Sequence, residues 1–198
     1  MKVKVISGTL KGSVLKLPKA GLRPTQERVK KSCFDILGRR VLGANVLDCF
    51  AGGGNLGIEA LSRGANRATF IEWESAPVLC LKKNLERLRL AGRGEVLQEN
   101  CFKAIRRLLR HGAKFDLVFV DPPYNIEVTT KFLRSLSRCD ILTPSALVVV
   151  RHPKQEVLPA EEGLRLIRQE QYGRTAVSFF EHSHDQNRKA PCSLSGEL

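Results

Sequence analysis

Residues 115–125, FDLVFVDPPYN, constrain the fold of this chain more than any other stretch. Residues 117–120 are a short apolar run bounded by turn signals, which is typical of a buried strand in a parallel sheet. The two prolines that follow Asp121 fix φ and remove two backbone donors, so the strand ends there. We therefore expect Asp121 at the carboxyl end of a central strand, beside carbonyl groups that no neighbouring strand pairs.

The residues Asp121, Pro122, Pro123 and Tyr124 could form a site that orients an amine. The exocyclic amine of a nucleobase has two N–H groups, which the Asp121 carboxylate and the Pro122 carbonyl can accept, while Tyr124 can stack on the ring. The amine lone pair is then free to attack an electrophilic methyl group. The alternative is a simple strand-ending turn, because Asp and Pro are ordinary turn residues.

Composition narrows the class of partner. The 198 residues carry a formal net charge of +13, and such an excess of Lys and Arg recruits polyanions, nucleic acid first among them. The length suits one main domain. No apolar run approaches the ~20 residues that span a bilayer and the start lacks a signal peptide, so we expect a cytoplasmic protein without membrane contact. Six widely spaced cysteines without a Cys-x-x-Cys pair argue against a metal site or disulfides.

Residues 3–17 alternate around a Gly-containing turn, which predicts two short strands in a hairpin. The lysines of this stretch meet no acid before Glu27, and this favours phosphate contact over a merely solvated surface. We expect Lys4, Lys11 and Lys16 to contact RNA. The basic run continues at Arg28, Lys30 and Lys31.

A helix is expected to follow, with Thr25 as a candidate N-cap and Gly38 near its end. Its apolar positions at helical spacing are Val29, Cys33, Ile36 and Leu37. Arg23 stands on a proline-stiffened loop before this helix. It could be a surface charge, hold a substrate phosphate, or cover a cofactor, and the sequence leaves these open.

Residues 45–50 read as the first parallel strand, and residues 51–57 turn from it into a helix that includes residues 58–61. A Gly-x-Gly-x-x-Gly match falls on Gly52, Gly54 and Gly57, with Ala51 at the start of the turn. Placed between strand and helix, these glycines would let the backbone approach a ligand. Asp48, just before the turn, suits an ammonium group better than a pyrophosphate, which favours a cofactor that carries an amino acid.

Glu72 ends the next expected strand, residues 68–72, about 20 residues after Gly52, where a carboxylate can take two ribose hydroxyls. A solvated strand end is the alternative. Trp73 could pack against the adenosine, and Ser75 could cap a helix whose stripe is Val78, Leu81, Leu85 and Leu88.

A third strand, residues 95–98, leads to Asn100 and Cys101 on the ligand side of the sheet. Asn100 could read the adenine edge or cap the helix expected at residues 103–111. Arg106, Arg107 and Arg110 give that helix a basic face that could lie along RNA or could be solvated. The candidate cofactor-binding set is Asp48, Ala51, Gly52, Gly54, Gly57, Glu72, Trp73, Asn100, Cys101 and Asp121.

The remaining pattern repeats the parallel topology. Residues 128–136 read as an amphipathic helix, residues 146–150 as a buried strand, and residues 164–172 with 175–181 as a closing antiparallel hairpin. The fold class is therefore α/β, a doubly wound and mostly parallel Rossmann-like sheet. We divide the chain into a basic hairpin extension (1–21), a catalytic domain (22–182) and a polar tail (183–198) that we expect to be disordered.

With the loop DCFAGGGNLGIEA, the acid of FIEWE, the FVDPPY strand and the RPT segment in this order, the chain resembles a known family. It is similar to the bacterial methyltransferases that modify N2 of one guanine in 16S ribosomal RNA of the small subunit. The resemblance covers roughly residues 3–182. One departure is visible: Gly53 and Asn55 stand in the loop where Ser and a small residue are usual, which puts the rigidity of the loop in question.

The resemblance implies S-adenosylmethionine as cofactor, a seven-stranded sheet with one reversed strand, and a guanine within assembled or assembling small subunits as target. We expect a monomer. Within methyltransferases, an adenine-N6 enzyme acting on DNA or RNA is the alternative, since that amine also suits Asp121. An NAD-dependent oxidoreductase would share the glycine loop but has no use for Asp-Pro-Pro-Tyr, and a cofactor-free RNA-binding module would leave the glycine loop without a purpose.

Overall fold

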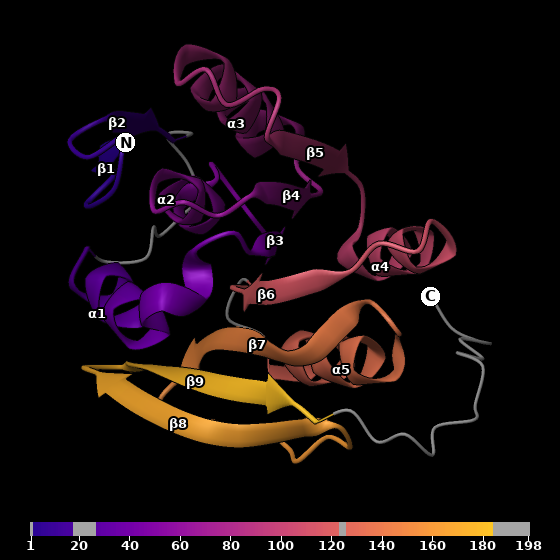
Figure 1. Ribbon diagram of the computed structural model, residues 1–198. Coiled ribbons are helices and arrows are strands. Elements are labelled where there is room, and N and C mark those ends of the chain that lie inside the picture. The colour runs from indigo at the N-terminus through magenta and orange to yellow at the C-terminus, as the bar shows by residue number, and fades with distance from the viewer. Residues whose placement is uncertain (1, 18–26, 123–125, 184–198) are drawn as a thin grey trace.

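The computed structural model describes residues 2–17, 27–122 and 126–183. Its centre is a seven-stranded sheet in the order β5-β4-β3-β6-β7-β9-β8 (Figure 1). All neighbouring pairs are parallel except β7 with β9 and β9 with β8, so β9 is the one reversed strand. The predicted fold class is confirmed. The strands are β3 (Asn45–Cys49), β4 (Arg67–Glu72), β5 (Gly94–Gln98), β6 (Phe115–Val120), β7 (Leu142–Pro153), β8 (Leu164–Tyr172) and β9 (Thr175–His182).

Two helical layers cover the sheet, and each encloses its own apolar core (Figure 1). On one face lie α1 (Glu27–Leu37), α2 (Asn55–Ser62) and α3 (Ser75–Arg87); on the other lie α4 (Cys101–Arg110) and α5 (Ile126–Arg138). A short 3-10 helix, Gly38–Val41, continues α1. Residues 117–120 are buried from both sides, which is why their run is continuously apolar rather than alternating.

Two local predictions need correction. Helix α2 begins at Asn55, so residues 55–57 are its first turn rather than part of the loop. Ser75 is the first residue of α3 and not its cap; the N-cap position is Glu74, and the Ser75 hydroxyl instead accepts a hydrogen bond from Gln98 Nε2 at 2.9 Å. The Thr25 cap lies outside the described residues.

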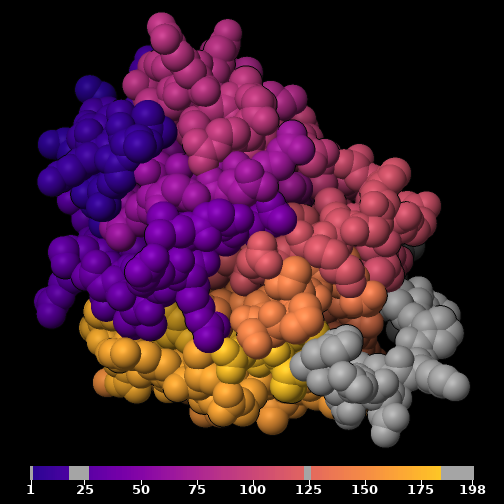
Figure 2. All heavy atoms as spheres, viewed as in Figure 1, coloured from indigo at the N-terminus to yellow at the C-terminus, as the bar shows by residue number. Residues whose placement is uncertain are grey.

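The predicted hairpin is present as a separate two-stranded antiparallel sheet, β1 (Lys2–Lys4) and β2 (Val14–Lys16). Its apolar residues face the domain: Val3, Val5, Leu15 and Leu17 are buried. In Figure 2 the hairpin lies directly against the residues of α2 and α3. Asn84 of α3 joins the two, because its side chain exchanges hydrogen bonds with the backbone of Lys16 at 3.0 and 2.9 Å.

Two features are absent from the described residues. None of their helices has both the length and the apolar character needed to cross a membrane. Nor do three or more of their His, Cys, Asp and Glu side chains come together as a possible metal site.

Candidate active site

Three carboxylates predicted for the site come from one edge of the sheet. Asp48, Glu72 and Asp121 lie at the ends of β3, β4 and β6, and these strands are parallel neighbours in the order β4-β3-β6. Parallel strands place their carboxyl ends at the same edge, so the topology gathers residues that are far apart in the chain. Backbone bonds tie the edge together: Ala51 N donates to Ile71 O at 3.0 Å and Asp121 N to Cys49 O at 3.4 Å.

The turn between β3 and α2 needs glycine for conformational and steric reasons. Gly52 and Gly54 have φ of 54° and 83°, a region that side chains with a Cβ rarely adopt. A Cβ on Gly57 would lie 2.3 Å from Phe70 Cε1, so only glycine allows α2 to pack this closely on β4. The predicted glycine turn therefore stands where the sequence placed it, with its helix starting earlier.

Glu72 is buried, and its carboxylate holds the backbone around it. Oε2 accepts from Gly52 N at 2.8 Å, while Oε1 accepts from Trp73 N at 2.7 Å and Glu74 N at 2.9 Å. The side chain thus fixes the glycine turn against the end of β4. Its expected contact with ribose hydroxyls stays a prediction.

Asp48 is buried, and its Oδ2 accepts from Gly57 N at 2.8 Å, in the first turn of α2. Burial raises the pKa of the Asp48 carboxyl well above its usual range, and the charges of Asp121 and Glu72 raise it further, against the Gly57 hydrogen bond. A cationic ligand at this edge would favour the ionised form of the Asp48 carboxyl. The electrostatics therefore suit an ammonium or sulfonium group.

Asp121 forms an ion pair that the sequence reading missed. Its Oδ1 accepts from Arg151 Nε at 2.5 Å, and both side chains are 15% exposed. The register explains the pair: Val120 of β6 lies opposite Val150 of β7, so the residues that follow them are neighbours. An arginine directly after the buried run 146–150 was the signal that could have found it.

Beside this pair, Cys33 of α1 lines a small, mostly apolar cavity together with Asp121 and Arg151. Burial and the Asp121 charge raise the pKa of the Cys33 thiol to about 12. The raised pKa disfavours the thiolate, and Cys33 is part of the wall of this cavity.

The other predicted site residues differ in their burial and in their contacts. Pro122 is buried beside Asp121. Trp73 is 69% exposed, so its ring is available at the surface of this edge. Asn100 is the N-cap of α4, where its Oδ1 accepts from Phe102 N at 2.9 Å. Of the two predicted roles, adenine contact or helix cap, this contact is the helix cap. Cys101 is buried in the core of the α4 and α5 layer. Arg23, Pro123 and Tyr124 lie outside the described residues.

The predicted RNA-contacting residues also differ from one another. Lys4, Lys11 and Lys16 have exposed side chains, and none has an acidic partner within the part of the chain that the structure describes. On α4, Arg106 and Arg110 are exposed, whereas Arg107 Nε lies 3.2 Å from Glu99 Oε1. The basic face of α4 is therefore partly neutralised.

Two lysines of the basic run after the hairpin form ion pairs with acidic side chains. Lys31 pairs with Asp35 at 2.7 Å on the surface of α1. Lys30 is fully buried, with its Nζ 3.1 Å from Glu59 Oε2, so the expectation that it adds to an RNA-facing run is wrong. The reason is its helical position: Lys30 shares the buried face of α1 with Val29, Cys33 and Phe34.

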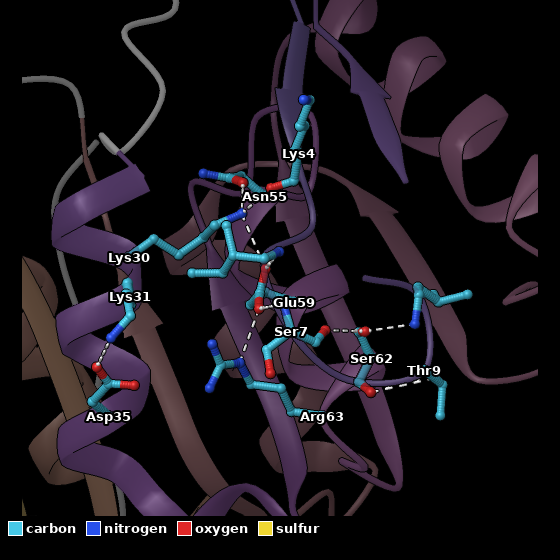
Figure 3. Close-up of polar contacts among 12 residues, drawn as sticks. Lys4, Ser7, Thr9, Lys30, Lys31, Asp35, Asn55, Glu59, Ser62 and Arg63 are labelled. Carbon is cyan, nitrogen blue, oxygen red and sulfur yellow. Dashed lines mark hydrogen bonds and ion pairs between the residues drawn. The ribbon is translucent and has the colours of Figure 1, made fainter. Parts of the chain in front are cut away.

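The Lys30–Glu59 pair anchors the hairpin to α2 (Figure 3). Glu59 accepts four bonds, from Ile6 N at 2.9 Å, Ser7 N at 3.1 Å, Arg63 Nε at 2.9 Å and Lys30. Lys30 Nζ also donates to Lys4 O at 2.7 Å and to Asn55 Oδ1 at 2.8 Å. Burial lowers the pKa of Lys30 and the Glu59 carboxylate opposes this. With three acceptors in reach, including a carboxylate, we assign the charged form.

Gly53 and Asn55, the two departures from the usual pattern, are held by this arrangement. A Cβ on Gly53 would lie 2.1 Å from Leu17 Cδ2 of the hairpin end, and Gly53 O accepts from Asn84 Nδ2 at 3.1 Å. Asn55 is 8% exposed, and its Nδ2 has no hydrogen-bond partner among the described residues. Gly53 thus packs against the hairpin and Asn55 accepts from Lys30 of α1, which leaves one buried donor of Asn55 unused.

Comparison with known proteins identifies a family for this chain. The family model described as conserved hypothetical protein 95 matches residues 3–181. A putative rRNA methyltransferase, YlbH, of Bacillus subtilis is 33% identical over 90% of this chain and 98% of its own. Ribosomal RNA small subunit methyltransferase D of Escherichia coli is 38% identical over 80% and 78%.

Among solved structures, the Escherichia coli putative methyltransferase yhhF has a TM-score of 0.83 and 30% identity, covering 92% of this chain and 99% of its own. The resemblance inferred from the loop, the Glu72 strand and the Asp-Pro-Pro-Tyr strand thus agrees with the sequence and structure comparisons. The chain belongs to the family described as conserved hypothetical protein 95.

Proposed function

We propose that this protein transfers a methyl group from S-adenosylmethionine to the exocyclic N2 amine of a guanine in 16S ribosomal RNA. The observation that carries the proposal is Asp121, held by Arg151 at the same sheet edge as the glycine turn, Asp48 and Glu72. The small-subunit rRNA methyltransferases among its relatives support the choice of substrate. The position of the guanine N2 amine follows from the resemblance, since Asp121 suits other exocyclic amines as well.

The site residues fit the cofactor. The edge combines a turn built on glycine with buried acids, and S-adenosylmethionine carries two positive groups, a sulfonium and an ammonium. We assign the ammonium to Asp48, the ribose hydroxyls to Glu72 and the adenine side to the exposed Trp73. When bound, the cofactor supplies a methyl group that is electrophilic because it is attached to a sulfonium.

The chain's own part is to orient and to stabilise. The Asp121 carboxylate accepts one N–H of the target amine and the Pro122 carbonyl accepts the other, which turns the nitrogen lone pair toward the methyl group. As the N–C bond forms, positive charge develops on the nitrogen and the carboxylate stabilises it. The methylated amine becomes acidic and its proton passes to water, so no separate base is required.

The substrate form is a finer proposal. A guanine within assembling small subunits is the target we infer, and we expect a monomer that acts in the cytoplasm, where such particles form. Tritiated methyl transfer should be measured on free 16S RNA, on immature small subunits and on DNA, with light scattering to establish the oligomeric state. Preferential labelling of DNA would replace the proposal with the adenine-N6 alternative.

The decisive variant is Asp121→Ala. Loss of one group that stabilises developing charge lowers turnover by about 10²–10³-fold. The affinity for S-adenosylhomocysteine, measured by calorimetry, should change little, because the contacts with its ammonium, ribose and adenine are assigned to Asp48, Glu72 and Trp73. Full turnover by Asp121→Ala, or wild-type protein that binds NAD and not S-adenosylhomocysteine, would contradict the proposed function.

A further inference from the structure

The side-chain amide of Asn55 has a buried donor that the protein does not use. Asn55 is the first residue of α2 and follows Gly54 in the turn from β3. It is 8% exposed, and its Nδ2 has no hydrogen-bond partner within the described residues. A buried N–H group without a partner costs free energy, so such groups are rare and call for an explanation.

The orientation of this amide is fixed by its neighbour. Lys30 Nζ lies 2.8 Å from Asn55 and can only donate as an ammonium, so the atom facing it must be the amide oxygen. A flipped amide would set two donors against each other. The nitrogen therefore points away from the Lys30–Glu59 pair, as Figure 3 shows for Asn55.

The surroundings of Nδ2 favour an anion. Asn55 is in the first turn of α2, where the helix dipole is positive. The Lys30 ammonium is bonded to the same side chain, but its charge is paired with that of Glu59. A carboxylate or phosphate oxygen would satisfy the donor and would be favoured by the helix dipole. Because the nitrogen is enclosed, a small group at the end of a flexible chain can reach it more readily than an RNA phosphate, which is attached to a bulky backbone.

We propose that Asn55 Nδ2 donates a hydrogen bond to the carboxylate of the methionine part of S-adenosylmethionine. The proposal rests on the proposed function and deepens it: Asp48 and Asn55 would hold the two opposite charges of the amino-acid group from the two ends of one glycine turn. Asn55 is a binding residue in this scheme, at a position where a small residue is usual, and it takes no part in the methyl transfer itself.

The test uses Asn55→Asp, which keeps an oxygen for Lys30 and removes the donor. Calorimetry should compare S-adenosylhomocysteine with its decarboxylated form, S-adenosyl-3-thiopropylamine, which retains the adenosine, thioether and ammonium. We expect the variant to bind S-adenosylhomocysteine at least about tenfold more weakly, since a hydrogen bond to a charged group is lost and a like charge added, with little or no weakening for the decarboxylated compound. Asn55→Ala, which adds no charge, should show the same selectivity with a smaller loss.

Asn66→Asp is the matched control. Asn66 precedes β4 at the opposite edge of the sheet, where it is exposed and its Nδ2 donates to Asn45 Oδ1. It should leave both affinities unchanged. Equal weakening of the two compounds by the Asn55 variants would show that the amide only supports the loop, and unchanged affinities would show that it has no ligand here; either result overturns the inference. Failure of the wild type to bind S-adenosylhomocysteine would instead overturn the proposed function.

Discussion

Arg151 Nε lies 2.5 Å from Asp121 Oδ1, and this ion pair joins the ends of two central parallel strands at the candidate active site. The two side chains are largely shielded from water, so their attraction is screened less than that of a surface pair. One carboxylate oxygen is thereby held in place, and the orientation of the other is set with it. We infer that Arg151 positions Asp121 for the target amine.

Arg151→Gln should therefore lower turnover with little effect on S-adenosylhomocysteine binding. Misplacement of a reacting group by about 1 Å can cost about 10²-fold in rate, and this is the loss we expect. Single-turnover methyl transfer measures this loss. Arg151→Lys should recover part of the rate, and a wild-type rate in Arg151→Gln would leave the pair a structural role only.

Asp48→Asn tests the electrostatics of the cofactor edge. Because burial raises the pKa of Asp48, the folded state keeps a proton that the unfolded chain releases, so the free energy of unfolding falls as pH rises from the usual carboxyl range to the raised value. The asparagine does not titrate and still offers an oxygen to Gly57 N. The free energy of unfolding of the variant minus that of the wild type should therefore be larger at pH 8 than at pH 4. The increase is about 1.4 kcal/mol for each unit by which the Asp48 pKa is raised, up to pH 8.

Urea unfolding of both proteins at the two pH values measures this difference. The same variant should bind S-adenosylhomocysteine more weakly, because the ammonium loses its charged partner. A stability difference that does not change with pH would mean that Asp48 is ionised in the free protein across this range.

Glu59→Gln tests the buried anchor of the hairpin. Removing one partner of a buried ion pair leaves an uncompensated charge, here on Lys30, and typically costs about 3–5 kcal/mol. Because Glu59 also accepts from Ile6 N and Ser7 N, the hairpin should loosen. Denaturant unfolding gives the first quantity and amide hydrogen exchange at residues 6 and 7 gives the second.

The double variant Lys30→Met with Glu59→Gln provides the comparison. It removes both charges, so it should cost less than the sum of the two single changes. Exchange at residues 6 and 7 should stay fast in it, since the carboxylate is still missing. Additive losses would contradict a direct interaction between the two charges.

The buried strands with continuous apolar runs could be predicted from the sequence, and so could the glycine turn. Residues 117–120 and 146–150 are buried, and short apolar runs rich in valine and bounded by turn residues favour central strands. What sequence could not give was the pairing between elements. Arg151 can be recognised as the partner of Asp121 only when the register between β6 and β7 is known. Lys30 can be recognised as buried only when α2, which carries Glu59, is known to lie beside α1.

The exposed lysines of the hairpin give the last prediction, which concerns RNA. Lys4 and Lys16 lie on the anchored two-stranded sheet and Lys11 lies in the turn between its strands. None of the three has an acidic partner among the described residues. A flipped base in the Asp121 site requires the flanking backbone to be held while unstacking costs a few kcal/mol, and lysines on a fixed platform can hold it. Each phosphate that a lysine neutralises contributes about 0.7–0.9 to the slope of log affinity against log salt.

Replacing these three lysines with Gln should weaken RNA binding and flatten the salt dependence by about 2 to 3, with S-adenosylhomocysteine affinity unchanged. The control replaces Arg39, Lys131 and Arg138, which are exposed on the 3-10 helix and α5, away from the hairpin, and removes the same charge. Filter binding from low to high salt separates the two triple variants. Equal slopes would mean that only net charge matters, and the docking surface would then have to be sought at Arg106 and Arg110 on α4, whose exposed side chains have no acidic partner in the described part of the chain.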